Sequence, residues 1–160
     1  MTFADEDLRH LRRCVELAAT GLSDGNEPFG SVLVSADGTV LLEDHNREKD
    51  GDHTRHPELA IAMWAVTNLT PDQRAEATVY TSGEHCPMCS AAHAWVGLGR
   101  IVFIVASTRL AELLEQWGVG PSPVAALPIT TVAPFLPVEG PVAELAGEME
   151  TLYERCFRPS

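Results

Sequence analysis

The sequence has almost no lysine and no extended cluster of positive charge. Lys49 is the single lysine among 160 residues, and 11 basic side chains stand against 23 acidic ones, which gives a net charge of −12. Nucleic-acid-binding proteins normally present a basic face, because neutralising phosphates dominates their affinity. The clustered arginines Arg9, Arg12 and Arg13 lie in an acidic segment. The composition therefore disfavours a polynucleotide partner.

The sequence also lacks a long hydrophobic run. No apolar stretch reaches the roughly 18 residues that cross a bilayer, and the acidic start, Asp5-Glu6-Asp7, has no apolar core of a secretory signal. Hydrophobic residues make up 45% of the chain and charged residues 21%, as in ordinary globular proteins. We therefore expect a single domain over residues 1–160, located in the cytoplasm and without a membrane partner.

Cysteine is scarce, with four residues at Cys14, Cys86, Cys89 and Cys156. A chain of this size buries enough surface to fold without disulfides. In a cytosolic protein, the Cys86–Cys89 pair in a CxxC spacing indicates metal binding or redox chemistry rather than a structural bridge. We expect Cys14 and Cys156, in helix-like segments, to be buried apolar residues.

The hydrophobic periodicity predicts alternating helices and strands. The predicted helices cover residues 4–22, 57–69, 87–98, 109–117 and 141–157. The predicted strands cover residues 31–35, 39–43, 77–81 and 101–106, with a weak edge strand at 129–132. Asp37-Gly38 is a strong hairpin signal between the first two strands. We expect an α/β domain of three layers, α-β-α, with a five-stranded mixed sheet whose last two strands are parallel because a helix connects them.

Three side chains suited to tetrahedral zinc are separated by thirty positions. His56 precedes Pro57, and Cys86 precedes Pro87 in a Cys-Pro-Met-Cys motif that ends at Cys89. One imidazole and two thiolates leave a fourth position open, as in catalytic zinc sites. Because proline favours the first helical position, we expect His56 and Cys86 to cap two helices whose positive N-termini stabilise thiolates.

Glu58 lies two residues after His56, in the first turn of the same helix. A carboxylate beside a zinc-activated water can take the proton of that water and deliver it elsewhere. Two alternatives remain open for the cysteine and histidine group, a structural zinc and a reduced CxxC without metal. The pattern H-x-E followed by a later CxxC is a known signature of zinc-dependent base deaminases.

The chain resembles the cytidine deaminase superfamily from Gly21 to Val105. Besides the ligand motifs, the resemblance is carried by Pro28-Phe29-Gly30, His45-Asn46 and Tyr80-Thr81-Ser82. These motifs are most similar to the free-base branch, which includes guanine deaminase and fungal cytosine deaminase, with tRNA adenosine deaminase as a near relative. Two positions depart from the family: Pro57 replaces an alanine and His85 replaces a proline.

The resemblance implies a cytidine-deaminase-like fold, a homodimer, and a role for each residue of the site. It implies one Zn²⁺ per subunit on His56, Cys86 and Cys89, with Glu58 as the proton shuttle. The implied substrate-binding residues are Asn46, which hydrogen-bonds the base, Phe29 and Trp95, which enclose its ring, Glu84, whose backbone carbonyl meets the leaving amine, and His85, which borders the pocket.

The sequence therefore predicts hydrolytic deamination of a small heteroaromatic base with release of ammonia. The expected substrates are a cytosine-like pyrimidine, guanine or an amino-triazine. One alternative is a tRNA-specific adenosine deaminase or a nucleoside deaminase. A further alternative is a binding module in which zinc only stabilises the fold.

Overall fold

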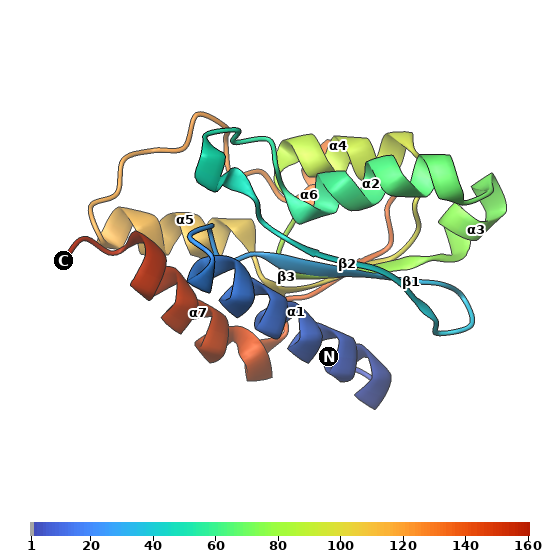
Figure 1. The fold of residues 1–160 in the computed structure, drawn as a ribbon, viewed down its shortest axis with the longest axis horizontal. Helices are drawn as coiled ribbons and strands as arrows, with labels where there is room; N and C mark the ends of the chain where they lie inside the picture. Colours follow the sequence, from blue (N-terminus) through green and yellow to red (C-terminus); the bar gives the residue numbers. More distant parts are fainter. Residues whose placement is uncertain (1) are drawn as a thin grey trace.

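The apolar strand segments form one sheet through the middle of the molecule. In the computed structural model, which describes residues 2–160, five strands follow the order β2-β1-β3-β4-β5 (Figure 1). The strands are β1 (Gly30–Val34), β2 (Val40–His45), β3 (Thr78–Gly83), β4 (Ile101–Val105) and β5 (Val138–Glu139). The helices are α1 (Asp5–Ser23), α2 (Pro57–Asn68), α3 (Pro71–Glu76), α4 (Pro87–Trp95), α5 (Ser107–Gln116), α6 (Ile129–Val132) and α7 (Ala143–Phe157), and a 3-10 turn, η1, spans Glu48–Asp50.

The connections set the direction of each strand. β1 and β2 form the predicted antiparallel hairpin, whose turn contains Gly38 with a positive φ of 87°. β1 also pairs antiparallel with β3. α4 connects β3 to β4, and α5 and α6 lie between β4 and β5, so these three strands run parallel. The predicted mixed sheet with parallel last strands is confirmed.

The position of the last strand differs from the prediction. Residues 129–132, predicted as an edge strand from their β-branched side chains, form the single helical turn α6, and the strand beside β4 is Val138–Glu139. Pro128 precedes the turn, and the Ile129 N–H donates to Oε1 of Glu84 at 2.8 Å. These tertiary constraints outweigh the strand propensity of the segment.

Helices cover both faces of the sheet and produce the predicted three layers. In Figure 1, α1, α5 and α7 lie on one face, and α2, α3, α4 and α6 lie on the other. β1 shows how the strands divide between the layers: Val32 and Val34 pack with residues of α1 and α7, whereas Leu33 packs with residues of α2. Burial on both faces explains why β1 and β4 read as nearly continuous apolar runs.

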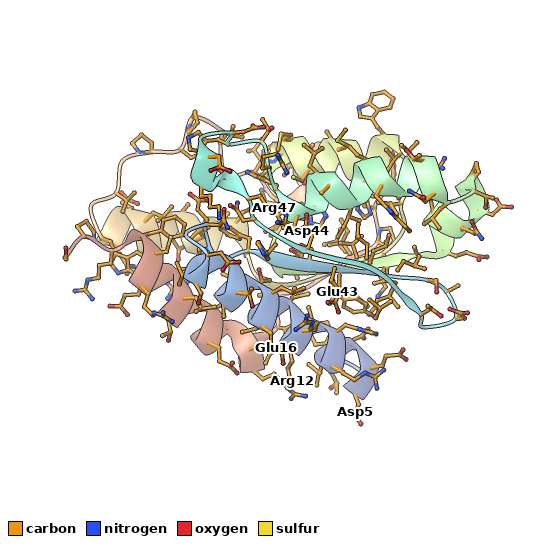
Figure 2. All side chains as sticks on the ribbon, viewed as in Figure 1. Asp5, Arg12, Glu16, Glu43, Asp44 and Arg47 are labelled. Carbon is orange, nitrogen blue, oxygen red and sulfur yellow. The ribbon has the colours of Figure 1, made fainter. Side chains whose placement is uncertain are left out.

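The surface arginines of α1 are paired with acids rather than gathered into a basic patch. Arg12 contacts Glu144 at 3.3 Å, and Arg13 contacts Glu16 at 2.8 Å and Glu43 at 2.9 Å. Figure 2 shows Arg12, Glu16 and Glu43 along the outer side of α1 and β2. No helix within residues 2–160 is both long and apolar enough to cross a membrane.

Candidate active site

Two helix N-termini carry the predicted metal ligands. His56 is the N-cap of α2 in extended backbone (φ −85°, ψ 141°), and Cys86 is the N-cap of α4 (φ −66°, ψ 168°). A proline occupies the first turn of each helix, as the sequence predicts. α4 follows directly on β3, so the end of a parallel strand and two positive helix ends meet at one point.

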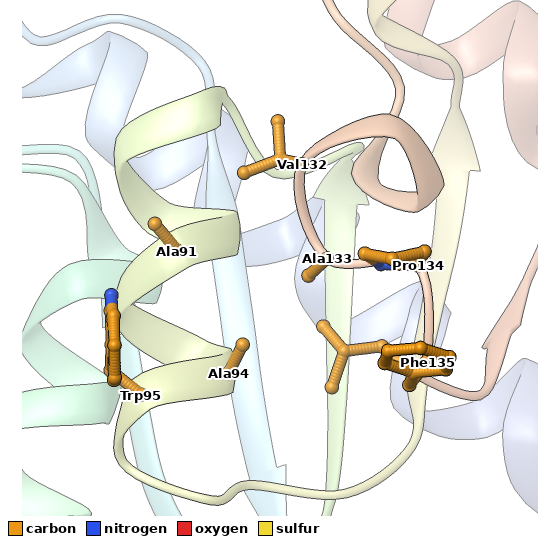
Figure 3. A pocket seen from close by; sticks show the side chains of 8 residues that line it. Ala91, Ala94, Trp95, Val132, Ala133, Pro134 and Phe135 are labelled. Atoms are coloured by element: carbon orange, nitrogen blue, oxygen red, sulfur yellow. The ribbon is translucent and has the colours of Figure 1, made fainter.

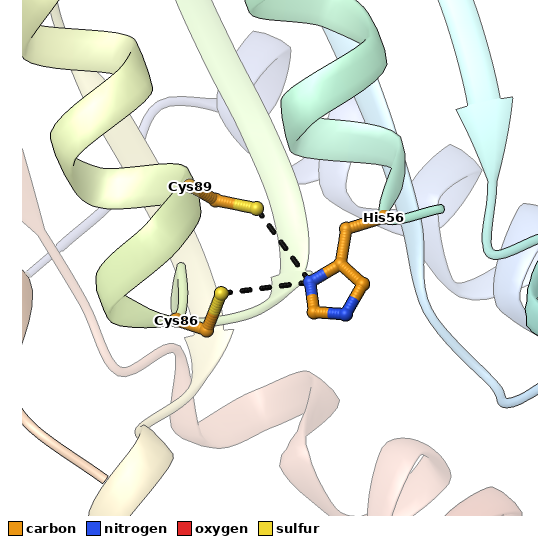
Figure 4. A group of neighbouring side chains, drawn as sticks. All are labelled: His56, Cys86 and Cys89. Atoms are coloured by element: carbon orange, nitrogen blue, oxygen red, sulfur yellow. Dashed lines mark hydrogen bonds between the residues drawn. The ribbon is translucent and has the colours of Figure 1, made fainter. Parts of the chain in front are cut away.

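The three side chains point toward one another with the spacing of a tetrahedral site (Figure 4). His56 Nδ1 lies 3.5 Å from Cys86 Sγ and 3.6 Å from Cys89 Sγ. Ligand lengths of about 2.3 Å to sulfur and about 2.1 Å to nitrogen place such atoms about 3.6 Å apart around one zinc ion. Within residues 2–160 no fourth donor joins the group. The donors fit zinc, and their number fits a catalytic site.

The electrostatics of the group favour a thiolate. The pKa of Cys86 is lowered to about 4, because its sulfur accepts hydrogen bonds from the Cys89 thiol and from His56. Burial by itself lowers the pKa of His56, but the hydrogen bond to Cys86 and the charges of Glu58, Cys86 and Glu48 raise it to about 9. The structure thus favours a Cys86 thiolate beside a protonated His56. A metal ion bound by both residues would displace the proton from the imidazole.

Glu58 lies in the first turn of α2, and its carboxyl group is held by two hydroxyls. Its Oε1 lies 3.1 Å from Ser31 Oγ and 2.9 Å from Thr81 Oγ1. Ser31 and Thr81 are register partners of β1 and β3, so the pairing of the strands places both hydroxyls side by side. Glu58 is 6% exposed, and its burial raises the pKa of the carboxyl group. Such a group takes up a proton readily and can pass it on.

Asn46 is fully buried at the end of β2 and is fixed by Glu48. Its Nδ2 donates to the Glu48 carboxylate, and its Oδ1 accepts from the Glu48 N–H at 2.9 Å. The same carboxylate lies 2.9 Å from His53 Nδ1 and 3.6 Å from His56 Nε2. Glu48 therefore connects the predicted base-binding amide to the far side of the predicted zinc ligand, a second contact of the kind that orients ligating histidines.

Glu27 and Glu48 form an acidic pair that the sequence analysis does not identify. Burial and the neighbouring Glu48 carboxylate raise the pKa of Glu27 to about 7, while His56 and His53 oppose this shift. The available signal is weak, because Glu27 and Glu48 are two of the 23 acidic residues of the chain and belong to no recognisable motif. Ser31 and Thr81, polar residues within buried strands, are the stronger clue.

The side chains of Phe29 and Glu84 contact different elements of the fold: Phe29 packs against α7, and Glu84 binds the starts of α5 and α6. Phe29 packs against Tyr153 and Phe157 of α7, with ring centroids 5.6 Å and 6.5 Å away. The side chain of Glu84 accepts from the N–H groups of Ser107 at 2.9 Å and Ile129 at 2.8 Å, so it fixes the starts of α5 and α6. This structural use leaves the backbone carbonyl, the group singled out in the sequence, as the functional candidate.

Two other predicted residues have side chains that make their contacts outside the ligand group. His85 is 1% exposed and packs edge-on against His93, with ring centroids 5.4 Å apart. Trp95 is 88% exposed at the opposite end of α4 from Cys86. Figure 3 shows Trp95 beside Ala91 and Ala94, across an apolar hollow of about 440 Å³ from the segment 132–136. Within one chain, Trp95 does not reach the site.

Comparison with known proteins shows which family the sequence matches. A sequence model of the cytidine and deoxycytidylate deaminase zinc-binding region matches residues 4–105. A probable cytosine deaminase of Schizosaccharomyces pombe is 31% identical over 142 residues, which cover 83% of this chain and 86% of the relative. The guanine deaminase of Bacillus subtilis is 35% identical over 104 residues, covering 64% of this chain and 66% of the relative.

A solved structure extends the likeness to the whole fold. The guanine deaminase from Nitrosomonas europaea superposes with a TM-score of 0.66, covering 96% of this chain and 86% of that one. At 19% identity, the similarity concerns the fold, including the region beyond residue 105 that the family model does not match.

Proposed function

The chain belongs to the cytidine and deoxycytidylate deaminase family and is a hydrolytic deaminase, and we propose that it acts on a free nucleobase or base analogue with one zinc ion per subunit. The expected substrates are a cytosine-like pyrimidine, guanine or an amino-triazine. The single observation that carries the proposal is the group of His56, Cys86 and Cys89, spaced for zinc and without a fourth protein donor in residues 2–160. The relatives that act on cytosine and guanine support the choice of a free base.

The proposed mechanism assigns the proton transfers to Glu58. Zinc bound at His56, Cys86 and Cys89 supplies the Lewis acidity that makes water a nucleophile near neutral pH. Glu58 takes a proton from the attacking water and delivers it to the ring nitrogen next to the carbon that bears the amine. The water oxygen bonds to that carbon, its second proton passes to the amine, the carbon–nitrogen bond breaks, and ammonia leaves a ring carbonyl behind. The hydroxyls on Oε1 keep the carboxyl group in place and leave Oε2 free of these two contacts.

The remaining predicted residues would bind and orient the ring. We assign a hydrogen bond to the base to Asn46, whose amide orientation is set by Glu48. Phe29 would pack against the ring, and the Glu84 carbonyl would accept from the leaving amine. His85 would act at the border of the pocket. A contact between Trp95 and the base would need a second chain, since the indole is exposed on the outside of α4.

Charge and surface chemistry support a small substrate and a dimer. The net charge of −12 and the acidic pair Glu27–Glu48 disfavour a phosphate-rich polynucleotide near the site. The exposed apolar face around Trp95 and Phe135 favours a homodimer. Four free cysteines favour the reducing cytoplasm.

The proposal is tested by measuring ammonia release from cytosine, guanine and an amino-triazine together with bound zinc. Changing Glu58→Ala should lower turnover by at least about 100-fold while the zinc content stays at one per chain. Glu148→Ala, on the exposed side of α7, is the matched control and should retain full activity. Undiminished turnover in zinc-loaded Glu58→Ala would contradict the assigned role.

The same assays separate the alternatives. Tight tRNA binding that weakens steeply with added salt would favour a nucleic-acid substrate over a free base. A zinc-loaded protein that releases no ammonia from any of the bases would indicate a binding module and would overturn the proposed reaction.

A further inference from the structure

The last helix carries a buried phenol that no protein group satisfies. Tyr153, in α7, is 0% exposed, and its hydroxyl is without a hydrogen-bond partner among residues 2–160. The other buried side-chain atoms in this state are ring nitrogens of His10 and His85. A buried hydroxyl without a partner costs free energy, because it has lost its hydrogen bonds to water. A phenylalanine would avoid this cost at the same position.

The polar side chains of β1 and β3 that hold Glu58 or precede Gly83 already have partners of their own. Ser31 and Thr81 contact Glu58, and Thr81 Oγ1 also lies 3.0 Å from the Gly83 carbonyl oxygen. Ser82 Oγ accepts from the Gly30 N–H at 3.0 Å. These three hydroxyls therefore have hydrogen-bond partners other than the phenol.

The Tyr153 hydroxyl nevertheless lies next to Gly83, at the end of β3. A Cβ atom built on Gly83 would lie 3.1 Å from the Tyr153 hydroxyl oxygen and 3.2 Å from Phe29 Cε1. Gly83 is two residues from Thr81 and three from Cys86, so the phenol lies over the segment that joins the proton shuttle to the metal ligands. Burial raises the pKa of the Tyr153 phenol, and the charge of Glu58 adds to this effect.

The surrounding wall suits a flat ring. Tyr153 packs with Phe29 and Phe157, with ring centroids 5.6 Å and 6.2 Å from its own. Apolar aromatic walls with a few convergent polar groups are typical of small-molecule pockets. In this wall the phenol hydroxyl supplies a donor, whereas the Glu48 carboxylate, which is paired with Glu27, supplies acceptors beside His56.

We propose that Tyr153 is a substrate-binding residue whose hydroxyl donates a hydrogen bond to a ring carbonyl oxygen or ring nitrogen of the base. The inference rests on the proposed deaminase function and narrows its substrate class. The preferred base carries an acceptor on the edge that faces α7 and amino or N–H donors on the edge that faces the acids.

The test removes one oxygen atom with Tyr153→Phe. We expect KM for the preferred base to rise about 10- to 100-fold with zinc content unchanged. The unfolding midpoint without base should stay equal or rise, because the variant removes an unpartnered buried hydroxyl. The matched control is Tyr80→Phe, which removes the chain's other phenol hydroxyl. That hydroxyl donates to Asp7 at 2.7 Å, so the control should lose stability and keep its KM.

Three outcomes would overturn the inference, and the first two are distinguishable from the third. Normal turnover with an unchanged KM in Tyr153→Phe overturns the role of Tyr153 alone. Calorimetric titration can measure the affinity for the base in Glu58→Ala and in the double variant Glu58→Ala, Tyr153→Phe, without any turnover. Equal affinities in the two proteins overturn the role of Tyr153. Absence of ammonia release from every base by the wild-type enzyme overturns the proposed function, and the inference falls with it.

Discussion

Arg100 is the residue through which the first helix and the last strand are joined. Its guanidinium contacts Asp7 of α1 at 2.8 Å and also pairs with Glu139 of β5. Tyr80 of β3 donates to the same Asp7 carboxylate at 2.7 Å. These contacts connect α1, β3 and β5, which are distant in the sequence. The hydrogen bond from Arg100 holds the pKa of Asp7 below its usual value.

Replacing Asp7→Asn should therefore change stability in a pH-dependent way. Because the folded pKa is lowered, the stabilisation from the Asp7 carboxylate is present above the unfolded pKa of 3.8 and is lost as pH falls through the folded value. We expect the variant to lose about 2 kcal/mol at pH 7, with the gap to wild type closing below about pH 4. Urea unfolding of both proteins from pH 3 to 8 measures this difference. A gap that stays constant over the whole range would contradict it.

Single residues also show how much of the site can be predicted from the sequence. The grouping of His56, Cys86 and Cys89 and the position of Glu58 are predictable, because local rules place them: a proline after each cap fixes the helix start, and short spacing fixes the rest. Tyr153, which we propose to bind the base, and Glu48 lie close to the site only through contacts with segments distant in the sequence. No local pattern distinguishes a phenol that faces a site from one that fills a core.

At the scale of elements, the close approach of α1 to β1 depends on a residue without a side chain. A Cβ atom on Gly30 would lie 2.5 Å from the Cys14 carbonyl oxygen and 2.8 Å from the Ala18 nitrogen. These are backbone atoms of α1, so the whole helix would have to move. Gly30 follows Phe29, so this packing also determines where the aromatic wall of the site lies.

Gly30→Ala should accordingly lower the free energy of unfolding by about 3 kcal/mol, as overpacked cores do. Gly147→Ala is the matched control, since Gly147 lies on an exposed face of α7 and a methyl group added there would have nothing within 4 Å. The control should gain up to about 1 kcal/mol from better helix propensity. Urea unfolding compares the two, and a Gly30→Ala protein as stable as wild type would show that α1 can shift without cost.

The elements themselves are predictable where a periodic pattern is long. The long helices, the hairpin and the central strands agree with the sequence within a few residues. The strand predicted at 129–132 is wrong and Val138–Glu139 is not predicted as a strand, because one helical turn or two paired residues carry too little periodicity to identify. Their placement depends instead on Glu84 and on Ile101, whose N–H donates to the Pro137 carbonyl.

For the whole molecule, the two helical layers differ in how many large hydrophobic side chains they expose to solvent. Seven large hydrophobic side chains are exposed among residues 2–160, and four of them, Met63, Val66, Trp95 and Phe135, belong to the layer of α2, α4 and α6. Trp95 and Phe135 are 88% and 98% exposed and border the apolar hollow in Figure 3. Aromatic residues concentrated on one face of an otherwise acidic molecule are typical of a protein–protein interface.

If this layer is the face where two copies meet, Trp95→Glu should produce monomers. A charge at the centre of an apolar interface stays unpaired when the copies associate, which costs more than the lost contact area. Light scattering coupled to gel filtration should give twice the 17.3 kDa chain mass for wild type and the single mass for the variant. Val40→Glu, at the opposite edge of the sheet, replaces another exposed apolar residue and should leave the dimer intact. A dimeric Trp95→Glu protein with a wild-type melting temperature would place the interface elsewhere.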